Sequence, residues 1–211
     1  VGGMALEESR TRVGWDMVGL AAGQMLHRDR EDITEEELKA AYEATLGTNR
    51  LVVYDHRGAT GSDNLINKIR TMVVHLGCKF ILLDHLTIAL TQVSGEIQNE
   101  RQAIDATMTR LVTLAAELDV NIALVCHLKR RDGGSFDDGA RISMQDLRGS
   151  SAIEGLSHTI IGVERNQQSE TERDVMTLRV LKDRWTGQTG EAGRLKFNNT
   201  SGRLEEYNAP P

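Results

Sequence analysis

The chain has 211 residues, of which 39% are hydrophobic and 27% charged, and its net charge is -6 at pH 7. This composition excludes a disordered chain, and the length favours one domain of ordinary to large size. No stretch approaches the roughly 18 apolar residues that a membrane-spanning helix needs, and no signal peptide opens the chain. Cys78 and Cys126 stand alone in apolar stretches, as is typical of a reducing compartment. We therefore expect a cytoplasmic protein, and the acidic balance does not exclude a local nucleic-acid site.

The first part of the chain is expected to alternate strands with helices. Ser9 and Thr34 are candidate N-caps for the first two helices, and Gly47 is expected to end the second. Helical spacing of apolar residues or helix-end signals predict helices over residues 9–27, 32–47, 64–76 and 99–118. Buried strands are expected over residues 1–6, 50–56, 79–84 and 120–127.

The rest of the chain is expected to be rich in strands. A long glycine-rich and charged loop covers residues 128–149, and a short helix is expected over residues 150–157. Further strands are expected over residues 158–165, 175–184, 193–199 and 203–207. The order of elements predicts an α/β fold with a largely parallel central sheet and antiparallel C-terminal strands. The unbroken apolar runs "FILL" and "IALV" predict parallel strands that are covered on both faces.

Three apolar strands run into polar chemistry at their carboxyl ends. Glu7, Asp84 and His127 follow the three strands, and ligands of open α/β sheets bind beyond such ends. A lone aspartate there is more often a turn or cap residue, but three such ends in one chain favour a site. An apolar strand followed by aspartate is the Walker B pattern, whose carboxylate holds Mg²⁺ on nucleotide phosphates. A glutamate on a neighbouring strand end can take a proton from water, and a histidine on the third can sense the γ-phosphate.

Five longer segments carry a resemblance to a known family. They are "ALEES", "FILLDHLTI", "ALVCHLK", "DLRGSSAIEGLSHTIIGVERNQQ" and "LKDRWTGQTG". Together they resemble the helicase domain of DnaB-type replicative hexameric helicases, in particular the phage primase-helicase branch, over nearly the whole chain. The resemblance implies a RecA-like core and a hexameric or heptameric ring that moves along single-stranded DNA. It also implies Mg²⁺, with ATP or dTTP hydrolysed between subunits, and a primase and a DNA polymerase as possible partners.

The resemblance also implies roles for the three strand ends. Glu7 would be the catalytic base, with its neighbour Glu8 as the rival candidate. Asp84 would bind Mg²⁺, and His127 would sense the γ-phosphate. His85 is adjacent to Asp84 but would point the other way along a strand, so we expect no role for it.

Other implied roles fall on the C-terminal strands. Arg184 would be an arginine finger that reaches the nucleotide of the adjacent subunit, with Lys182 assisting it. Two residues apart on one strand, the two cations would point to the same face; the alternative is an ordinary solvated strand face. Arg165 and Phe197 match family positions that contact the base or stack on it, although a core position is an equal alternative for Phe197.

The loop after residue 128 would bind DNA and face the channel of the ring. It carries five basic and four acidic side chains between residues 129 and 148. The net charge is only about +1, so net charge alone would attract DNA phosphates weakly. A solvated, mobile loop is the alternative. The residues expected to contact DNA are Lys129, Arg130, Arg148 and Gly149.

The sequence contains no G-x-x-x-x-G-K-[ST] phosphate loop. In the family this loop precedes the strand expected to begin at Val1. We therefore expect residues 1–211 to be one RecA-like helicase ATPase domain truncated at its N-terminus, without the phosphate loop or the primase and linker region. Competing hypotheses are a RecA-like recombinase or regulatory ATPase without unwinding activity, and a non-enzymatic remnant.

The 211-residue chain alone is expected to hydrolyse nucleotide slowly or not at all. The reason is that the sequence lacks the glycine-rich backbone cradle and lysine that hold the β- and γ-phosphates. Steady-state phosphate release measures this directly. A rate comparable to that of an intact helicase would contradict the prediction.

Overall fold

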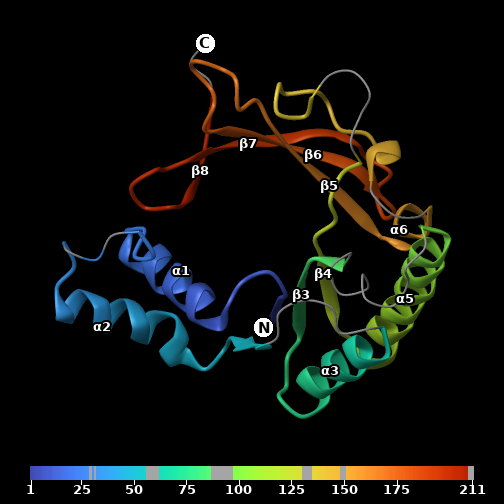
Figure 1. The fold of residues 1–211 in the computed structure, drawn as a ribbon, viewed down its shortest axis with the longest axis horizontal. Helices are drawn as coiled ribbons and strands as arrows, with labels where there is room; N and C mark the ends of the chain where they lie inside the picture. Colours follow the sequence, from blue (N-terminus) through green and yellow to red (C-terminus); the bar gives the residue numbers. More distant parts are fainter. Residues whose placement is uncertain are drawn as a thin grey trace.

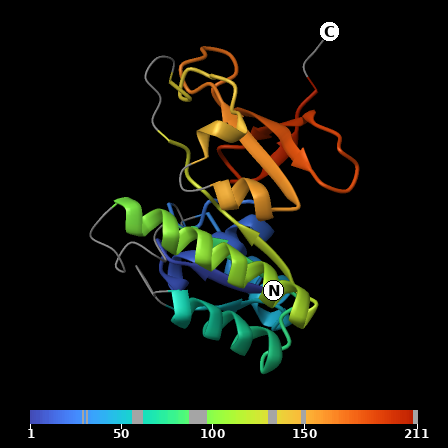
Figure 2. The same cartoon turned by 90° about the vertical axis from the view of Figure 1, so that its right-hand side faces the viewer.

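Two four-stranded sheets organise the chain (Figure 1) in a computed structural model that describes residues 1–28, 30, 32–55, 62–86, 97–129, 135–147 and 151–208. The first sheet is parallel, with the order β2 (Val52–Val53), β1 (Gly2–Ala5), β3 (Phe80–Asp84), β4 (Asn121–Leu124). The second is antiparallel, with the order β5 (Thr159–Arg165), β6 (Val175–Asp183), β7 (Gly190–Phe197), β8 (Leu204–Glu206). Figure 2 shows the antiparallel sheet above the parallel one, so the C-terminal strands form a layer of their own. The predicted fold class is confirmed.

Helices α3 (Ser62–Val74) and α5 (Ile97–Leu118) bury one face of the parallel sheet. Met4, Ile81 and Leu83 are fully buried among side chains of these helices. A Cβ atom on Gly2 would lie 2.7 Å from the Ile81 side chain and 2.8 Å from that of Met72. Glycine at the start of β1 therefore lets the strand approach α3 closely.

The opposite face of this sheet is partly open, so the expectation that the parallel strands are covered on both faces is wrong. Exposure alternates along β3, and Phe80 and Leu82 are 38% and 43% exposed. Val125, just beyond β4, is 41% exposed. Helix α1 (Arg10–Ala22) packs against α2 (Glu35–Ala44) and does not cover this face, which is why the apolar runs are not buried on both sides.

Side-chain caps fix the starts of α1 and α2 as predicted. The Ser9 hydroxyl accepts a hydrogen bond from the amide of Arg12. Thr34 and Glu37 form a reciprocal capping box. Their backbone and side-chain hydrogen bonds lower the pKa of Glu37.

Several predicted boundaries are wrong. Helix α1 ends before Gly23, which adopts the left-handed conformation with φ of 72°. Helix α2 ends at Ala44, and Gly47 lies in the short 3₁₀ turn η1 (Leu46–Thr48), so it is not the helix C-cap. Strands β2 and β4 are shorter than expected.

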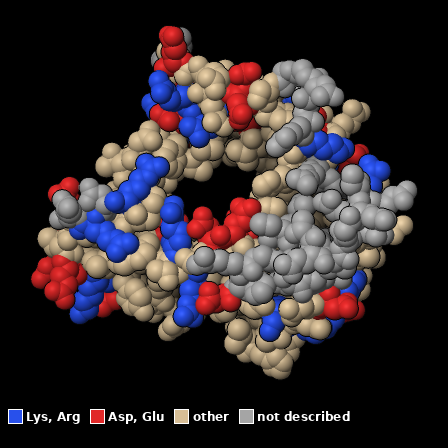
Figure 3. Space-filling view, in the orientation of Figure 1, with Lys and Arg blue, Asp and Glu red and all other residues tan. Residues whose placement is uncertain are grey.

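A turn near the C-terminus holds the end of α1. Arg203 Nε donates to the carbonyl of Leu20 at 2.7 Å, and its Nη2 donates to that of Ala21 at 3.0 Å. A cation at the carboxyl end of a helix also interacts favourably with the helix dipole. Through this contact the β7–β8 turn meets α1, and Figure 3 shows the molecule hollowed between the N-terminal helices and the antiparallel sheet.

Within the described residues, no helix has the length and apolar character to cross a membrane.

Replacing Arg203 by alanine is expected to loosen α1 from the β7–β8 turn. Two hydrogen bonds to the helix end are lost, so we expect the free energy of unfolding to fall by about 1 kcal/mol. Amide hydrogen exchange should rise most in the last turn of α1. The matched control is Arg70→Ala, which removes an exposed ion pair with Glu117 and should change stability by less than about 0.5 kcal/mol. Equal exchange in α1 for both variants would contradict the contact.

Candidate active site

The carboxyl ends of β1, β3 and β4 meet at one edge of the parallel sheet. Ala5 pairs with Asp84, and the amide of Leu6 donates to the carbonyl of Asp84 at 2.8 Å. The amide of Val125 donates to the carbonyl of Leu83 at 2.9 Å. The carboxyl ends of the three strands are therefore held side by side, and Glu7 and His127 follow two of them.

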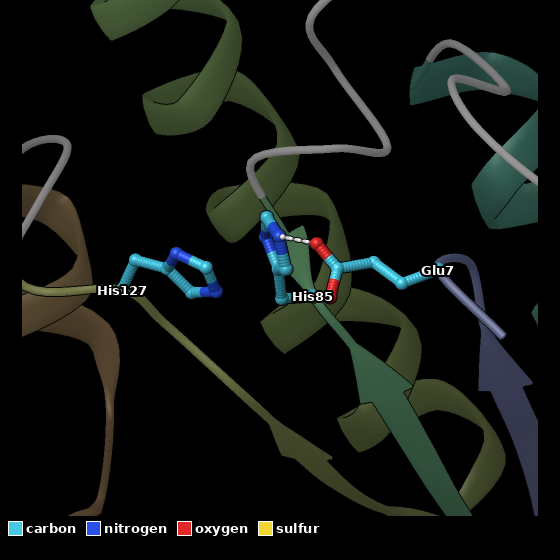
Figure 4. Close-up of side chains that lie close together, drawn as sticks. All are labelled: Glu7, His85 and His127. Carbon is cyan, nitrogen blue, oxygen red and sulfur yellow. Dashed lines mark hydrogen bonds and ion pairs between the residues drawn. The ribbon is translucent and has the colours of Figure 1, made fainter.

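Glu7, His85 and His127 form a compact cluster at this edge, which we call the edge triad (Figure 4). His85 Nε2 lies 3.0 Å from the carboxylate of Glu7. The ring centroids of His85 and His127 are 4.0 Å apart. Glu7 and His127 are exposed, whereas His85 is buried at 4% exposure. Figure 4 shows Glu7 reaching across from the end of β1 and His127 approaching from the other side.

The expectation that His85 points away from the site is wrong. Alternation of side chains applies within a strand, but β3 ends at Asp84. The chain turns there, and the amide of Leu86 donates to the carbonyl of Val125 at 3.3 Å. His85 therefore projects between Glu7 and His127, and sequence reasoning could find it only as a polar residue directly after a strand.

Asp84 is the last residue of β3 and is half-buried. Among the described residues, no side chain donates a hydrogen bond to its carboxylate. A free carboxylate at the mouth of a sheet fits Mg²⁺, which takes one or two protein carboxylates and completes its shell with water and phosphate oxygens. Glu7 and Glu8 are both exposed, and of the two it is Glu7 whose carboxylate lies in the edge triad.

The loop after β4 is anchored at its two ends. Leu128 and Leu147 form an isolated antiparallel bridge. The amide of Lys129 donates to the carbonyl of Asp146 at 2.7 Å, and Lys129 Nζ donates to the carbonyl of Gln145 at 3.0 Å. Lys129 is exposed and lies two residues after His127. The other expected DNA contacts, Arg130, Arg148 and Gly149, lie outside the described residues.

The same loop is fastened to β5 and to the residues just after it. Gln167 Nε2 donates to the carboxylate of Asp137 at 3.0 Å, and Asp138 bridges Asn166. Gly139, with φ of 82°, packs so closely on Asn166 that a Cβ atom would lie 2.9 Å from that side chain. Residues of the "ERNQQ" motif therefore anchor this loop.

A largely buried ion pair also anchors the loop. Glu164 accepts two hydrogen bonds from Arg179, at 2.7 and 2.9 Å, and one from the amide of Ile142 at 2.9 Å. Burial would raise the pKa of Glu164, but the hydrogen bonds and the charge of Arg179 outweigh it and hold the pKa below its usual value. The carboxylate thus ties the loop to both β5 and β6.

Lys182 and Arg184 reach the same place, as their spacing predicted. Lys182 Nζ donates to the carbonyl of Glu154 at 2.5 Å, and Arg184 Nη2 donates to that of Gly155 at 2.5 Å. These carbonyls lie in the last turn of α6 (Ser151–Leu156). Arg184 is exposed, so its guanidinium is accessible from outside the chain.

Trp185 was missed in the sequence. It follows Arg184, is 81% exposed, and stacks on His158 with ring centroids 5.9 Å apart. The available signal was a tryptophan in the polar segment "DRWTGQTG", where no other apolar side chain stands.

Arg165 and Phe197 lie at one end of the antiparallel sheet. Both contact Asp174: Arg165 Nη2 lies 3.6 Å from its carboxylate, and the amide of Phe197 donates to its carbonyl at 2.8 Å. Phe197 is half-buried and lines a cavity of about 180 Å³ together with Trp15 of α1. The ring is thus neither a full core residue nor free in solvent.

Comparison with known proteins gives consistent matches. The sequence model of the "DnaB-like helicase C terminal domain" matches residues 4–206. A "DNA helicase/primase" of Enterobacteria phage T3 is 37% identical over 210 residues, which are 97% of this chain and 37% of that protein. The chain therefore spans little more than a third of that relative's length.

Two solved structures share the fold at low sequence identity. One, described as an "ATPase Domain", superposes with a TM-score of 0.76 at 18% identity, and the match covers 98% of this chain and 74% of the other. A DnaB-like replicative helicase, described with its interactions with primase, gives a TM-score of 0.79 at 17% identity. That match covers 98% of this chain and 51% of the other.

Replacing Glu164 by glutamine is expected to lower the free energy of unfolding at pH 7 by about 2 kcal/mol, because Arg179 is left without its anion. Since the pKa of Glu164 is lowered by folding, the pair stabilises the fold above the pKa of an unfolded glutamate. That contribution disappears as pH falls through the folded pKa. Urea unfolding at pH 7 and pH 4 should therefore show a smaller acid loss for the variant than for the wild type.

The matched control is Glu172→Gln, which breaks the more exposed pair with Arg194. It should cost less at pH 7 than Glu164→Gln. An equal cost for the two variants would mean that burial does not strengthen the Glu164 pair.

Proposed function

Because the chain belongs to the family of DnaB-like helicase C-terminal domains, we propose that the full-length protein is a replicative DNA helicase. It hydrolyses a nucleoside triphosphate at subunit interfaces and moves along single-stranded DNA. The observation that carries this proposal is the gathering of Glu7 and His127 around His85 at the sheet edge where β3 ends in Asp84. An acid, a metal ligand and a sensor are the groups that this reaction needs within reach of one phosphate chain.

Asp84 is the proposed ligand of Mg²⁺, which would neutralise charge on the β- and γ-phosphates. Glu7 is the proposed general base. Its carboxylate is exposed to solvent and held by His85, so it can orient a water molecule and accept its proton. The nucleotide is ATP or dTTP.

His127 is the proposed γ-phosphate sensor. It precedes Lys129 by two residues, and Leu128, which stands between them, forms the bridge with Leu147. A shift of His127 on hydrolysis would therefore move the anchored start of the loop. The proposed DNA contacts are Lys129, Arg130, Arg148 and Gly149.

Arg184 and Lys182 are the proposed cations that act on the nucleotide of an adjacent subunit. In the free chain they donate to α6 carbonyls, and Arg184 could exchange that neutral acceptor for phosphate oxygens, which bind guanidinium more strongly. Arg165 and Phe197 are proposed to hold the base. These roles require a ring, which we propose to be a hexamer or heptamer. A primase and a DNA polymerase are its proposed partners in the cytoplasm of a bacterial or phage-infected cell.

In the full-length protein, replacing Arg184 by alanine is expected to reduce DNA-stimulated hydrolysis by at least about a thousandfold, because an arginine finger contributes that much to the rate. Nucleotide binding, measured by fluorescent-analogue titration, should change little. Arg70→Ala on the outer surface of α3 is the matched control and should keep wild-type activity.

Strand separation on a forked duplex tests the wider proposal. Hydrolysis stimulated by DNA without strand separation would instead indicate a recombinase or a regulatory ATPase. Unchanged hydrolysis in the Arg184 variant would refute the finger assignment.

A further inference from the structure

The edge triad places three metal-binding side chains in one small volume. One ligand atom each from Glu7, His85 and His127 can be chosen so that all three lie within 4.8 Å of one another. His85 Nε2 lies 3.0 Å from the Glu7 carboxylate.

The ligand types select a class of metal. Two imidazole nitrogens and one carboxylate oxygen suit Zn²⁺, Co²⁺ or Ni²⁺, whereas Mg²⁺ and Ca²⁺ prefer oxygen ligands alone. Three protein ligands with a fourth position open to water are typical of accessible zinc sites. The triad therefore differs in kind from the lone Asp84 carboxylate, which suits Mg²⁺.

The geometry lets the triad close on an ion. Bonds of about 2.1 Å in a tetrahedral site put ligand atoms about 3.4 Å apart. The buried His85 ring is fixed by packing, while the exposed Glu7 and His127 side chains can turn toward it. Because all three residues follow hydrogen-bonded strand ends, their backbones are already in position.

We propose that Glu7, His85 and His127 form a binding site for a divalent transition metal, with Zn²⁺ as the representative ion. The site occupies two groups that the proposed function uses as base and sensor. If that function holds, a bound Zn²⁺ blocks hydrolysis by removing the free carboxylate of Glu7, so the site is inhibitory.

Calorimetric titration of Zn²⁺ into the 211-residue chain, without nucleotide, tests the site independently of any catalytic role. We expect one Zn²⁺ per chain, retained in excess Mg²⁺. Co²⁺ should give the visible absorption of a tetrahedral site with nitrogen and oxygen ligands. Glu7→Gln and His127→Gln should each weaken binding at least about tenfold, since each removes one ligand.

The matched control is His75→Gln, an exposed histidine of the same chain next to α3, which should leave affinity unchanged. His85→Gln should also abolish binding, but His85 is buried and its variant could misfold. The Glu7 and His127 variants change exposed side chains and keep the test decisive.

Any of three results would overturn the proposal. These are no stoichiometric binding by the wild type, equal affinity in the Glu7 and His127 variants, and displacement of Zn²⁺ by Mg²⁺ at comparable concentration.

Discussion

The site depends on the parallel hydrogen bonding that aligns the ends of β1, β3 and β4. A shift of one strand by one residue would turn its side chains to the other face of the sheet. The bond from the Leu6 amide to the Asp84 carbonyl fixes where the chain leaves β1, and so where Glu7 begins. The packing of α3 and α5 on the buried face holds this alignment. The positions of the site residues are therefore set by backbone hydrogen bonds and register before any contact between their side chains.

Cations in the C-terminal half mainly hold backbone carbonyls and carboxylates of the same chain. Arg179 neutralises Glu164, Lys182 and Arg184 hold the end of α6, and Arg203 holds the end of α1. In the first of these pairs the side chains of Arg179 and Glu164 are 14% and 9% exposed, whereas Arg184 and Arg203 are exposed. The exposed cations are held more weakly and can exchange their carbonyls for other acceptors, whereas the Glu164 pair anchors the charged loop.

Much of the fold and part of the site could be predicted from local patterns. The strand ends at Glu7, Asp84 and His127 were readable because apolar runs stop at polar residues. The inward position of His85 was not, because the alternation rule ends where the strand ends. The open face at Leu82 was also missed, since an apolar run does not show whether a helix covers it. The tie from Arg203 to α1 joins distant segments, and no local pattern reports such a contact.

The contact of Arg203 with Leu20 spans 183 positions of the chain, which has a consequence for folding during synthesis. Helix α1 leaves the ribosome long before Arg203, the residue that holds its carboxyl end. Contacts between such distant residues form late and slow the folding of a domain. Until the β7–β8 turn is made, the α1–α2 pair lacks this anchor. During that interval the nascent chain exposes a helix pair that chaperones and proteases can reach.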